Sequence, residues 1–410
     1  MLKTCVSLCF LVIVGILGCY GSQDETRLVS SLLQRSNYVK YVRPGQTNND
    51  TVQLKFGVAL IQIMNLDESS QVLHTLVWLR KSWQDYRLKW NPSDFGGIDH
   101  IRIPGEHIWR PDVILYNSAK DKWEYSVDAL AVVSSDGSVL WIPPMHLHSS
   151  CSIDLTYFPY DTQICYLKFG SWTFDGSQVD IDFYDILKEV DLNDYIMNRD
   201  WTIIDSSARK NVKRYPCCKE PYPDLMFSLK LRRNNVHYAY TLVGPSIIVA
   251  LIIPLMFLLP PGSQEKTSLG VGVLLGLILL ALTIQTMLPP TGYYLPALAL
   301  YNLACVGLTA CSVAFATIVN VAWWKRGQLP GIIRTVMING LGRLLCVSPE
   351  TYRSMTQDRK LSEDAVAVLP TDDKLLSDWQ LLAIVLDRLL LVIFLLATII
   401  ITIVFHVSSG

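Results

Sequence analysis

Four apolar runs in the second half of the chain constrain its fold more than any other feature. They cover residues 240–259, 267–288, 295–324 and 381–407. Each run is long enough to cross a hydrocarbon core of about 30 Å, and charged residues lie almost entirely at the edges of the runs. Asp387 and Arg388 lie inside the fourth run, where we expect them near its cytoplasmic end. The sequence therefore predicts four membrane-spanning helices.

The distribution of basic residues predicts how these helices are oriented. The lysines and arginines between the third and fourth runs are Lys325, Arg326, Arg334, Arg343, Arg353, Arg359, Lys360 and Lys374. Because cytoplasmic loops carry an excess of basic residues, we place residues 325–378 in the cytoplasm. This short segment contains "LPGIIRTVMINGLGRLL", which has the pattern of an amphipathic interfacial helix. Residues 379–410 then hold the end of a cytoplasmic helix, the fourth span and an extracellular tail.

The N-terminus predicts entry into the secretory route. Residues 1–22 combine Lys3, an apolar run and small residues at the end, which is the pattern of a signal peptide cleaved near Gly21 or Ser22. Residues 23–238 would then be extracellular and oxidised, and residues 239–324 would hold the first three spans. In this context Asn49, in the sequon Asn49-Asp50-Thr51, is a candidate glycosylation site. Because sequons are common by chance, we give glycosylation and a chance match equal weight.

The extracellular part has the pattern of a β-sandwich. After a short helix around residues 25–35, apolar and polar residues alternate in "VQLKFGVALIQI" and "HTLVWLRKSW". Asp136-Gly137 lies between two apolar runs, which is a hairpin signal. The predicted fold class is an α+β membrane protein, with an N-terminal all-β sandwich ectodomain followed by a four-helix transmembrane bundle.

Two adjacent cysteines, Cys217 and Cys218, lie in "YPCCKEPY". Neighbouring Cα atoms are about 3.8 Å apart, below the usual disulfide range of roughly 4.4–6.8 Å, so a bridge between them would be strained and would rigidify a hairpin tip. The residues alone leave two alternatives, in which one of them pairs with Cys151 or Cys165, or both bind a metal ion. No histidine or further cysteine nearby completes a metal-ligand set.

Composition argues against two other classes of function. The formal net charge of −1 argues against nucleic acid as a partner. The sequence contains no catalytic-triad spacing, glycine-rich phosphate loop or cluster of metal ligands. We therefore expect no catalytic residues, no metal site, no cofactor and no enzyme activity.

The segment "CSIDLTYFPYDTQIC" has thirteen residues between Cys151 and Cys165, with an aromatic and proline centre at Phe158 and Pro159. By itself it indicates a disulfide staple on a sandwich. With this spacing it resembles the defining loop of the Cys-loop family of pentameric ligand-gated ion channels, and the resemblance covers about residues 25–407. "YPCCKEPY" is similar to the agonist-capping loop of nicotinic acetylcholine receptor subunits of the α type. The resemblance implies a homopentamer or heteropentamer with bridges Cys151–Cys165 and Cys217–Cys218.

The same resemblance implies an agonist site between subunits. The principal face would comprise Tyr116, Trp172, Tyr215, Cys217, Cys218 and Tyr222, and the complementary face Trp78, Leu140 and Ile142. A single tryptophan or tyrosine in a β-domain usually packs in the core, but here five aromatic positions match together. Such rings attract an ammonium cation by about 0.5–2 kcal/mol per contact, although a box of rings could also bind a non-cationic amphiphile.

Steps of three and four residues along the second run define one helical face. It comprises Glu265, Ser268, Gly272, Leu275, Leu279, Leu282 and Thr286. A leucine stripe is usually a helix packed against other helices, but this one begins and ends with polar residues. "EKTSLGVGVLLGLILLAL" resembles the pore-lining helix of the family, which implies a gate at Leu275 and a carboxylate ring at Glu265 that favours cations. Gly272 and Thr286 depart from the polar and acidic rings of relatives and should lower conductance.

The resemblance also implies residues that couple binding to gating. "NLDESSQV" contributes Glu68 and "LRRNNVHY" contributes Arg233, expected as a buried pair beside Phe158 and Pro159. Either charged residue could instead be an ordinary solvated surface charge.

The resemblance finally implies a plasma membrane protein, with a postsynaptic location as one expectation. Its expected partners are an acetylcholine-like ammonium agonist, Na⁺, K⁺ and membrane lipid, with Ca²⁺ permeation left open. The predicted function is an agonist-gated cation channel subunit. The alternative is a poorly conducting or heteromer-only subunit with a ligand other than acetylcholine.

Overall fold

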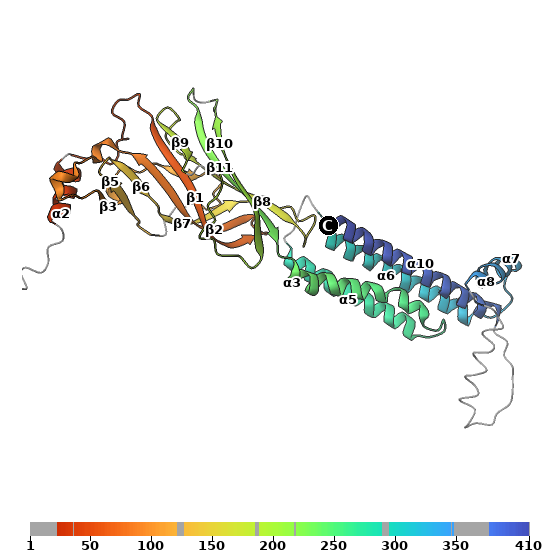
Figure 1. The fold of residues 1–410 in the computed structure, drawn as a ribbon. Coiled ribbons are helices and arrows are strands. Elements are labelled where there is room, and N and C mark those ends of the chain that lie inside the picture. Colours follow the sequence, from red (N-terminus) through yellow and green to blue (C-terminus); the bar gives the residue numbers. More distant parts are fainter. Residues whose placement is uncertain are drawn as a thin grey trace, which may run out of the picture. The chain divides into compact units, whose positions relative to one another are not determined.

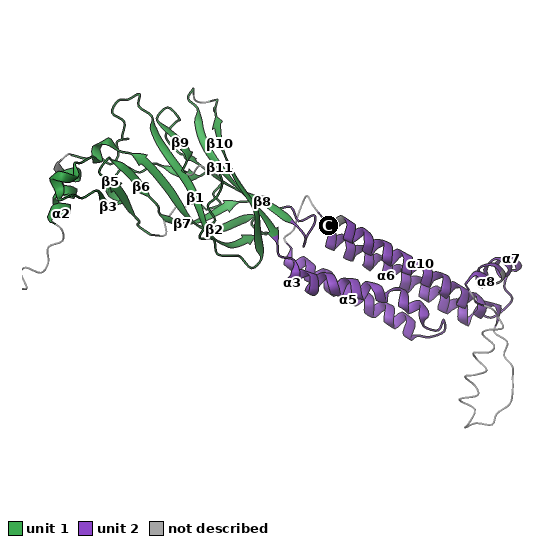
Figure 2. Cartoon of the chain, in the orientation of Figure 1, with its two compact units in different colours: residues 1–153, 162–232 green, residues 154–161, 233–410 purple. Residues whose placement is uncertain are grey.

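The computed structural model describes residues 23–35, 37–120, 127–184, 188–216, 219–288, 295–345, 347 and 377–409. Several features expected from the sequence lie outside the described residues. They are the signal peptide, Cys217, Cys218, the 289–294 turn and most of the cytoplasmic segment. The chain divides into two compact units, shown in Figure 2. One unit comprises residues 1–153 and 162–232, and the other comprises residues 154–161 and 233–410.

The first unit begins with the predicted N-terminal helix and continues as strands (Figure 1). The helix is α2 (Gln23–Ser30), extended by one π-helical turn, η1 (Ser31–Arg35). The strands are β1 (Val52–Asp67), β2 (Val72–Gln84), β3 (His100–Pro104), β4 (Val113–Leu115), β5 (Leu130–Ser134), β6 (Ser138–Trp141), β7 (Pro144–Ser150), β8 (Thr162–Ser171), β9 (Val179–Phe183), β10 (Trp201–Lys213) and β11 (Tyr222–Arg233). The prediction of a β-rich ectodomain is confirmed.

These strands form two sheets that pack face to face. A seven-stranded sheet has the order β3-β5-β6-β2-β1-β9, with β7 also paired to β2, and a four-stranded sheet has the order β10-β11-β8-β4. Phe56 of β1 contacts Phe169 of β8 and Phe227 of β11, with ring centroids 4.8 and 6.2 Å apart. These fully buried rings belong to different sheets, so the hydrophobic core lies between the sheets, as in a sandwich.

The alternation seen in the sequence has a direct counterpart in the sheets. Along β2, buried residues alternate strictly with residues that are more exposed. The predicted hairpin joins β5 to β6, where Val133 lies opposite Val139. Its turn contains Gly137 at a φ of 83°, a conformation that residues with a Cβ rarely adopt. The turn chemistry therefore fixes the register of this hairpin.

Among its described residues, the second unit contains four helices that are long and apolar enough to cross a membrane. The first candidate span, Val236–Leu258, combines α3 (Val236–Tyr238), η5 (Ala239–Val243), α4 (Gly244–Ile252) and η6 (Pro254–Leu258). The second span is α5 (Glu265–Met287) and the third is α6 (Ala297–Trp324). The fourth span, Asp378–Val407, lies within α10 (Asp378–Ser409). Pro254 lies at the change from α-helix to 3₁₀-helix in the first span, because proline cannot donate the next hydrogen bond of an α-helix.

Small and hydroxyl-bearing residues form part of the buried side of α6. Its buried residues include Cys305, Thr309, Ser312 and Ala316, at helical spacing. Thr309 Oγ1 donates to the carbonyl oxygen of Cys305 at 2.7 Å, so the hydroxyl is satisfied within its own helix. Small residues let helix backbones approach closely where lipid provides no hydrophobic force between helices.

The predicted interfacial helix follows the third span. It comprises α7 (Gly331–Ile333), η7 (Arg334–Leu341) and α8 (Gly342–Leu344). Leu329 and Ile338 form a buried cluster with Leu382 of α10. This segment therefore packs its apolar side against the first turns of the fourth long helix.

Candidate ligand-binding face, junction and pore helix

Two of the predicted agonist-binding rings lie together at the ends of paired strands. Tyr116 directly follows β4 and Trp172 directly follows β8. These strands are antiparallel, with Val113 opposite Ser171, so the two aromatic residues lie close together. Their ring centroids are 6.4 Å apart at an interplanar angle of 65°. Trp172 is 69% exposed, which leaves its ring available to a ligand.

The other two predicted rings form a second pair beside the first. Tyr222 opens β11 and Tyr215 lies just beyond the end of β10; their centroids are 5.7 Å apart. Burial raises the pKa of Tyr116 to about 12, and the charges of Tyr215 and Asp224 add to the shift. Tyr116 therefore keeps its proton at physiological pH, and its hydroxyl donates to the carbonyl oxygen of Ser171 at 2.5 Å. The structure thus brings all four principal aromatic residues together.

Asp112 holds the backbone that carries Trp172, a role that the sequence reasoning missed. One carboxylate oxygen accepts from Ser171 Oγ, and the other accepts from the Thr173 backbone N–H at 2.7 Å and from its hydroxyl at 2.6 Å. The Trp172 N–H donates to the Asp112 carbonyl oxygen at 3.3 Å. Asp112 lies in the segment "WRPDVILYN", which also contains Tyr116, but its hydrogen-bonding partners lie about sixty residues further along the chain, so the sequence did not reveal them.

The predicted complementary residues lie on the other sheet. Trp78 of β2 is 38% exposed, and Leu140 of β6 lies opposite Ser82 of β2. Since Trp78 and Ser82 are an even number of positions apart, Leu140 shares the outer face of the sheet with Trp78. Ile142 follows two residues later, also partly exposed. Their grouping on one face agrees with the expected complementary wall, which stays a prediction.

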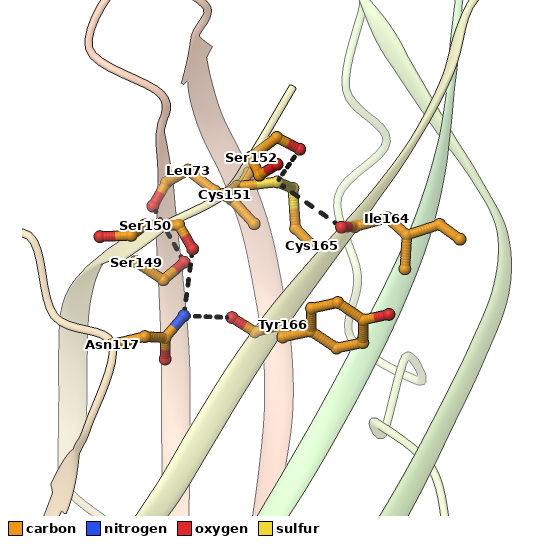
Figure 3. The surroundings of a disulfide bond; sticks show 9 residues. All are labelled: Leu73, Asn117, Ser149, Ser150, Cys151, Ser152, Ile164, Cys165 and Tyr166. Carbon is orange, nitrogen blue, oxygen red and sulfur yellow. Dashed lines mark hydrogen bonds between the residues drawn. A yellow bond between two sulfur atoms is a disulfide. The ribbon is translucent and has the colours of Figure 1, made fainter. Parts of the chain in front are cut away.

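The predicted disulfide between Cys151 and Cys165 is present, and both cysteines are buried (Figure 3). This bond rules out the alternative in which Cys217 or Cys218 pairs with one of them. The vicinal bridge itself lies outside the described residues and stays a prediction.

Asn117, next to Tyr116, donates to the carbonyl oxygens of Ser150 and Tyr166 at 3.1 and 2.8 Å (Figure 3).

Arg233 has a buried partner that the sequence reasoning did not name. Its Nε and one terminal nitrogen donate to the two oxygens of Asp161 at 2.7 and 3.1 Å, and both side chains are 2% exposed. The Arg233 guanidinium also lies 5.1 Å from the Phe158 ring centroid, and Phe158 contacts Tyr238 at 5.0 Å. The aromatic centre of the 154–161 segment thus packs against this ion pair. The expected contact of Arg233 with Glu68 stays a prediction.

The predicted pore-facing stripe of α5 is exposed in the single chain. Leu275, Leu279 and Leu282 are 57%, 56% and 52% exposed. The buried residues of the helix are Lys266, Gly270, Val273, Leu277 and Ile284, which lie on a different face. The leucine stripe therefore does not pack within its own subunit.

Among the described residues, no group of three or more histidine, cysteine or acidic side chains could hold a metal ion.

Comparison with known proteins identifies the family that has this architecture. The neurotransmitter-gated ion-channel ligand binding domain matches residues 25–235. The neurotransmitter-gated ion-channel transmembrane region matches residues 242–370. The chain belongs to the neurotransmitter-gated ion-channel family. This family consists of channels, in agreement with the expectation that the chain is not an enzyme.

Similar members of the neurotransmitter-gated ion-channel family include acetylcholine receptor subunits. The chain is 37% identical over 356 residues to acetylcholine receptor subunit alpha-like 2 of Drosophila melanogaster, covering 84% of the chain and 62% of that relative. It is 39% identical over 356 residues to subunit alpha-L1 of Schistocerca gregaria, covering 84% and 64%. It is 36% identical over 344 residues to neuronal subunit alpha-3 of Carassius auratus, covering 83% and 66%. The chain thus spans less than two thirds of each relative's length.

Replacing Asp112 by asparagine should weaken agonist binding. The change weakens the hydrogen bonds that order the Trp172 loop, and bonds to a charged group contribute about 1.5–3 kcal/mol, so we expect the half-maximal agonist concentration to rise about ten-fold. Asp182→Asn, which breaks an exposed pair with Lys55 at 3.0 Å, serves as the matched control and should leave this concentration unchanged. Equal responses from the two variants would contradict the role of Asp112.

Proposed function

We propose that this chain is a subunit of an agonist-gated, cation-selective channel that binds a quaternary or tertiary ammonium ligand at subunit interfaces. The observation that carries the proposal is the gathering of Tyr116, Trp172, Tyr215 and Tyr222 into one group with Trp172 largely exposed. Aromatic ring faces attract cations, and the attraction grows as the cation loses its water. The similarity to acetylcholine receptor subunits supports the choice of an ammonium ligand.

A site between subunits is favoured by the placement of the two predicted faces. The principal aromatic residues lie at the ends of strands of the four-stranded sheet, whereas Trp78 and Leu140 belong to the seven-stranded sheet. One chain therefore supplies both faces, and neighbouring copies in a pentamer could complete each site. This arrangement supports a homopentamer, although heteropentamers with related subunits use the same geometry.

The pore is proposed along the exposed stripe of α5. Leu275, Leu279 and Leu282 would form successive apolar rings that close the pore by dewetting. Glu265 is exposed at the N-terminal end of the helix, where a ring of carboxylates would attract Na⁺ and K⁺.

Voltage-clamp recording from cells that express this chain alone tests the proposal. We expect acetylcholine, choline or a related amine to evoke cation currents, and Trp172→Ala to abolish them at agonist concentrations that saturate the unaltered channel. Tyr41→Ala is the matched control, because Tyr41 is an aromatic residue outside the site and is 84% exposed. Currents that survive Trp172→Ala would contradict the proposed site.

A second candidate function is a subunit that binds ligand but conducts poorly by itself. It rests on Gly272, because a glycine gives the pore-facing stripe no polar side chain at this level, although an added Cβ there would meet no atom within 4 Å. Silence of the chain alone at the cell surface, with currents on coexpression of a related subunit, would favour this candidate.

A further inference from the structure

One ion pair is buried among the long helices of the second unit. Lys266, near the start of α5, donates from Nζ to Oδ1 of Asp387 in α10. The two side chains are 1% and 5% exposed. Nζ lies 5.0 Å from the centroid of the Phe257 ring, which itself packs on Phe394 at 5.2 Å. The pair therefore lies in apolar surroundings.

Stability alone does not account for such a pair. Removing two charges from water is costly, and a well-packed apolar pair of similar volume often holds helices together equally well or better. Charged residues within a membrane-spanning region are expensive and usually mark a function. Oδ2 of Asp387 is buried and accepts no hydrogen bond among the described residues. Lys266 is therefore the direct hydrogen-bonding partner of this carboxylate.

The position of Lys266 in the chain suggests what that function is. Glu265, the preceding residue, is exposed on the proposed pore face, and consecutive helical residues point about 100° apart. A lysine and a glutamate at the same level of the helix have opposite effects on a permeant cation. The charge of Lys266 is buried, where solvent screens it weakly, so its field would reach the pore unless a negative charge lay closer.

We propose that Asp387 sets the charge of the inner pore mouth as a positioning residue that acts through Lys266. Its carboxylate neutralises Lys266, which leaves the carboxylate of Glu265 as the net charge that attracts cations at this level. The fourth span thus contributes to ion selectivity although its residue does not touch the permeant ion. This inference rests on the proposed function of the chain as a cation channel.

Single-channel recording of the full chain tests the inference. Asp387→Asn leaves Lys266 without its countercharge, and we expect the conductance for monovalent cations to fall about two-fold or more, as in Glu265→Gln. The double variant Lys266→Met with Asp387→Leu removes both charges and should restore the conductance of the unaltered channel. Because an apolar pair also replaces a packing role, rescue alone does not separate the two roles, and the decisive readout is the conductance of each open channel.

Arg388→Gln is the matched control. Arg388 is the next charged residue of α10, but its side chain is exposed and its charge is screened by solvent, so its removal should leave conductance unchanged. Single-channel conductance measures the current through one open channel. A loss of folded protein lowers the number of channels but does not lower the conductance of each one. If Asp387→Asn alone fails to reach the surface, an epitope-tagged copy coexpressed with the unaltered chain should give channels of stepwise lower conductance.

Two results separate failure of this inference from failure of the proposed function. An unchanged conductance in Asp387→Asn, or in channels shown to contain the tagged copy, overturns the inference if Glu265→Gln still lowers conductance. An unchanged conductance in Glu265→Gln as well, or no agonist-evoked current with or without coexpressed subunits, refutes the proposed pore and with it this inference.

Discussion

Replacing Leu275 by threonine is expected to lower the half-maximal agonist concentration by about ten-fold or more and to allow some opening without agonist. An apolar ring resists hydration, and a hydroxyl in each subunit lowers the cost of filling the constriction with water. Because Leu275 is 57% exposed within the single chain, the substitution should not disturb the packing of α5 against its own subunit. Dose–response curves from whole-cell currents measure the shift.

A leucine two positions further along the same helix provides the control. Leu277 is fully buried within the subunit, so Leu277→Thr should reduce the number of channels at the surface instead of easing their opening. If the two variants shifted the agonist response equally, the stripe that contains Leu275 would not be the face that controls water entry.

Replacing Arg233 by glutamine should abolish agonist-evoked currents. Removing one member of a buried ion pair costs about 3–5 kcal/mol, because Asp161 would stay buried without its guanidinium partner. We also expect fewer receptors at the surface, measured with a membrane-impermeant label. Normalising current to surface label separates a gating defect from a folding defect.

The neighbouring residue supplies the matched control for Arg233. Arg232 carries the same charge but is exposed, so Arg232→Gln should leave both current and surface label unchanged. Normal gating in Arg233→Gln would refute a coupling role for the Asp161–Arg233 pair. A comparable loss in Glu68→Gln would support the predicted contact of Glu68 with Arg233, whereas normal function there would leave Asp161 as the partner that matters.

Sequence reasoning located the four long helices, the β-rich ectodomain and the disulfide between Cys151 and Cys165. These features depend on local information. The length of an apolar run decides whether a helix can cross a membrane, strict alternation marks a strand with one buried face, and Asp136-Gly137 suits the positive φ of a hairpin turn. The family resemblance then predicted Tyr116 and Trp172 as site residues, which stays a prediction, and the structure has their ring centroids 6.4 Å apart.

Only the tertiary structure decided which distant groups pair. Asp161 with Arg233, and Lys266 with Asp387, are 72 and 121 residues apart in the chain. Asp112 likewise holds a loop 61 residues away. The sequence does not show which residue a charged side chain pairs with. The partner depends on how strands and helices pack and on which charged side chains become buried next to each other. The sequence by itself thus determined the elements and their order, whereas packing determined the polar contacts between them.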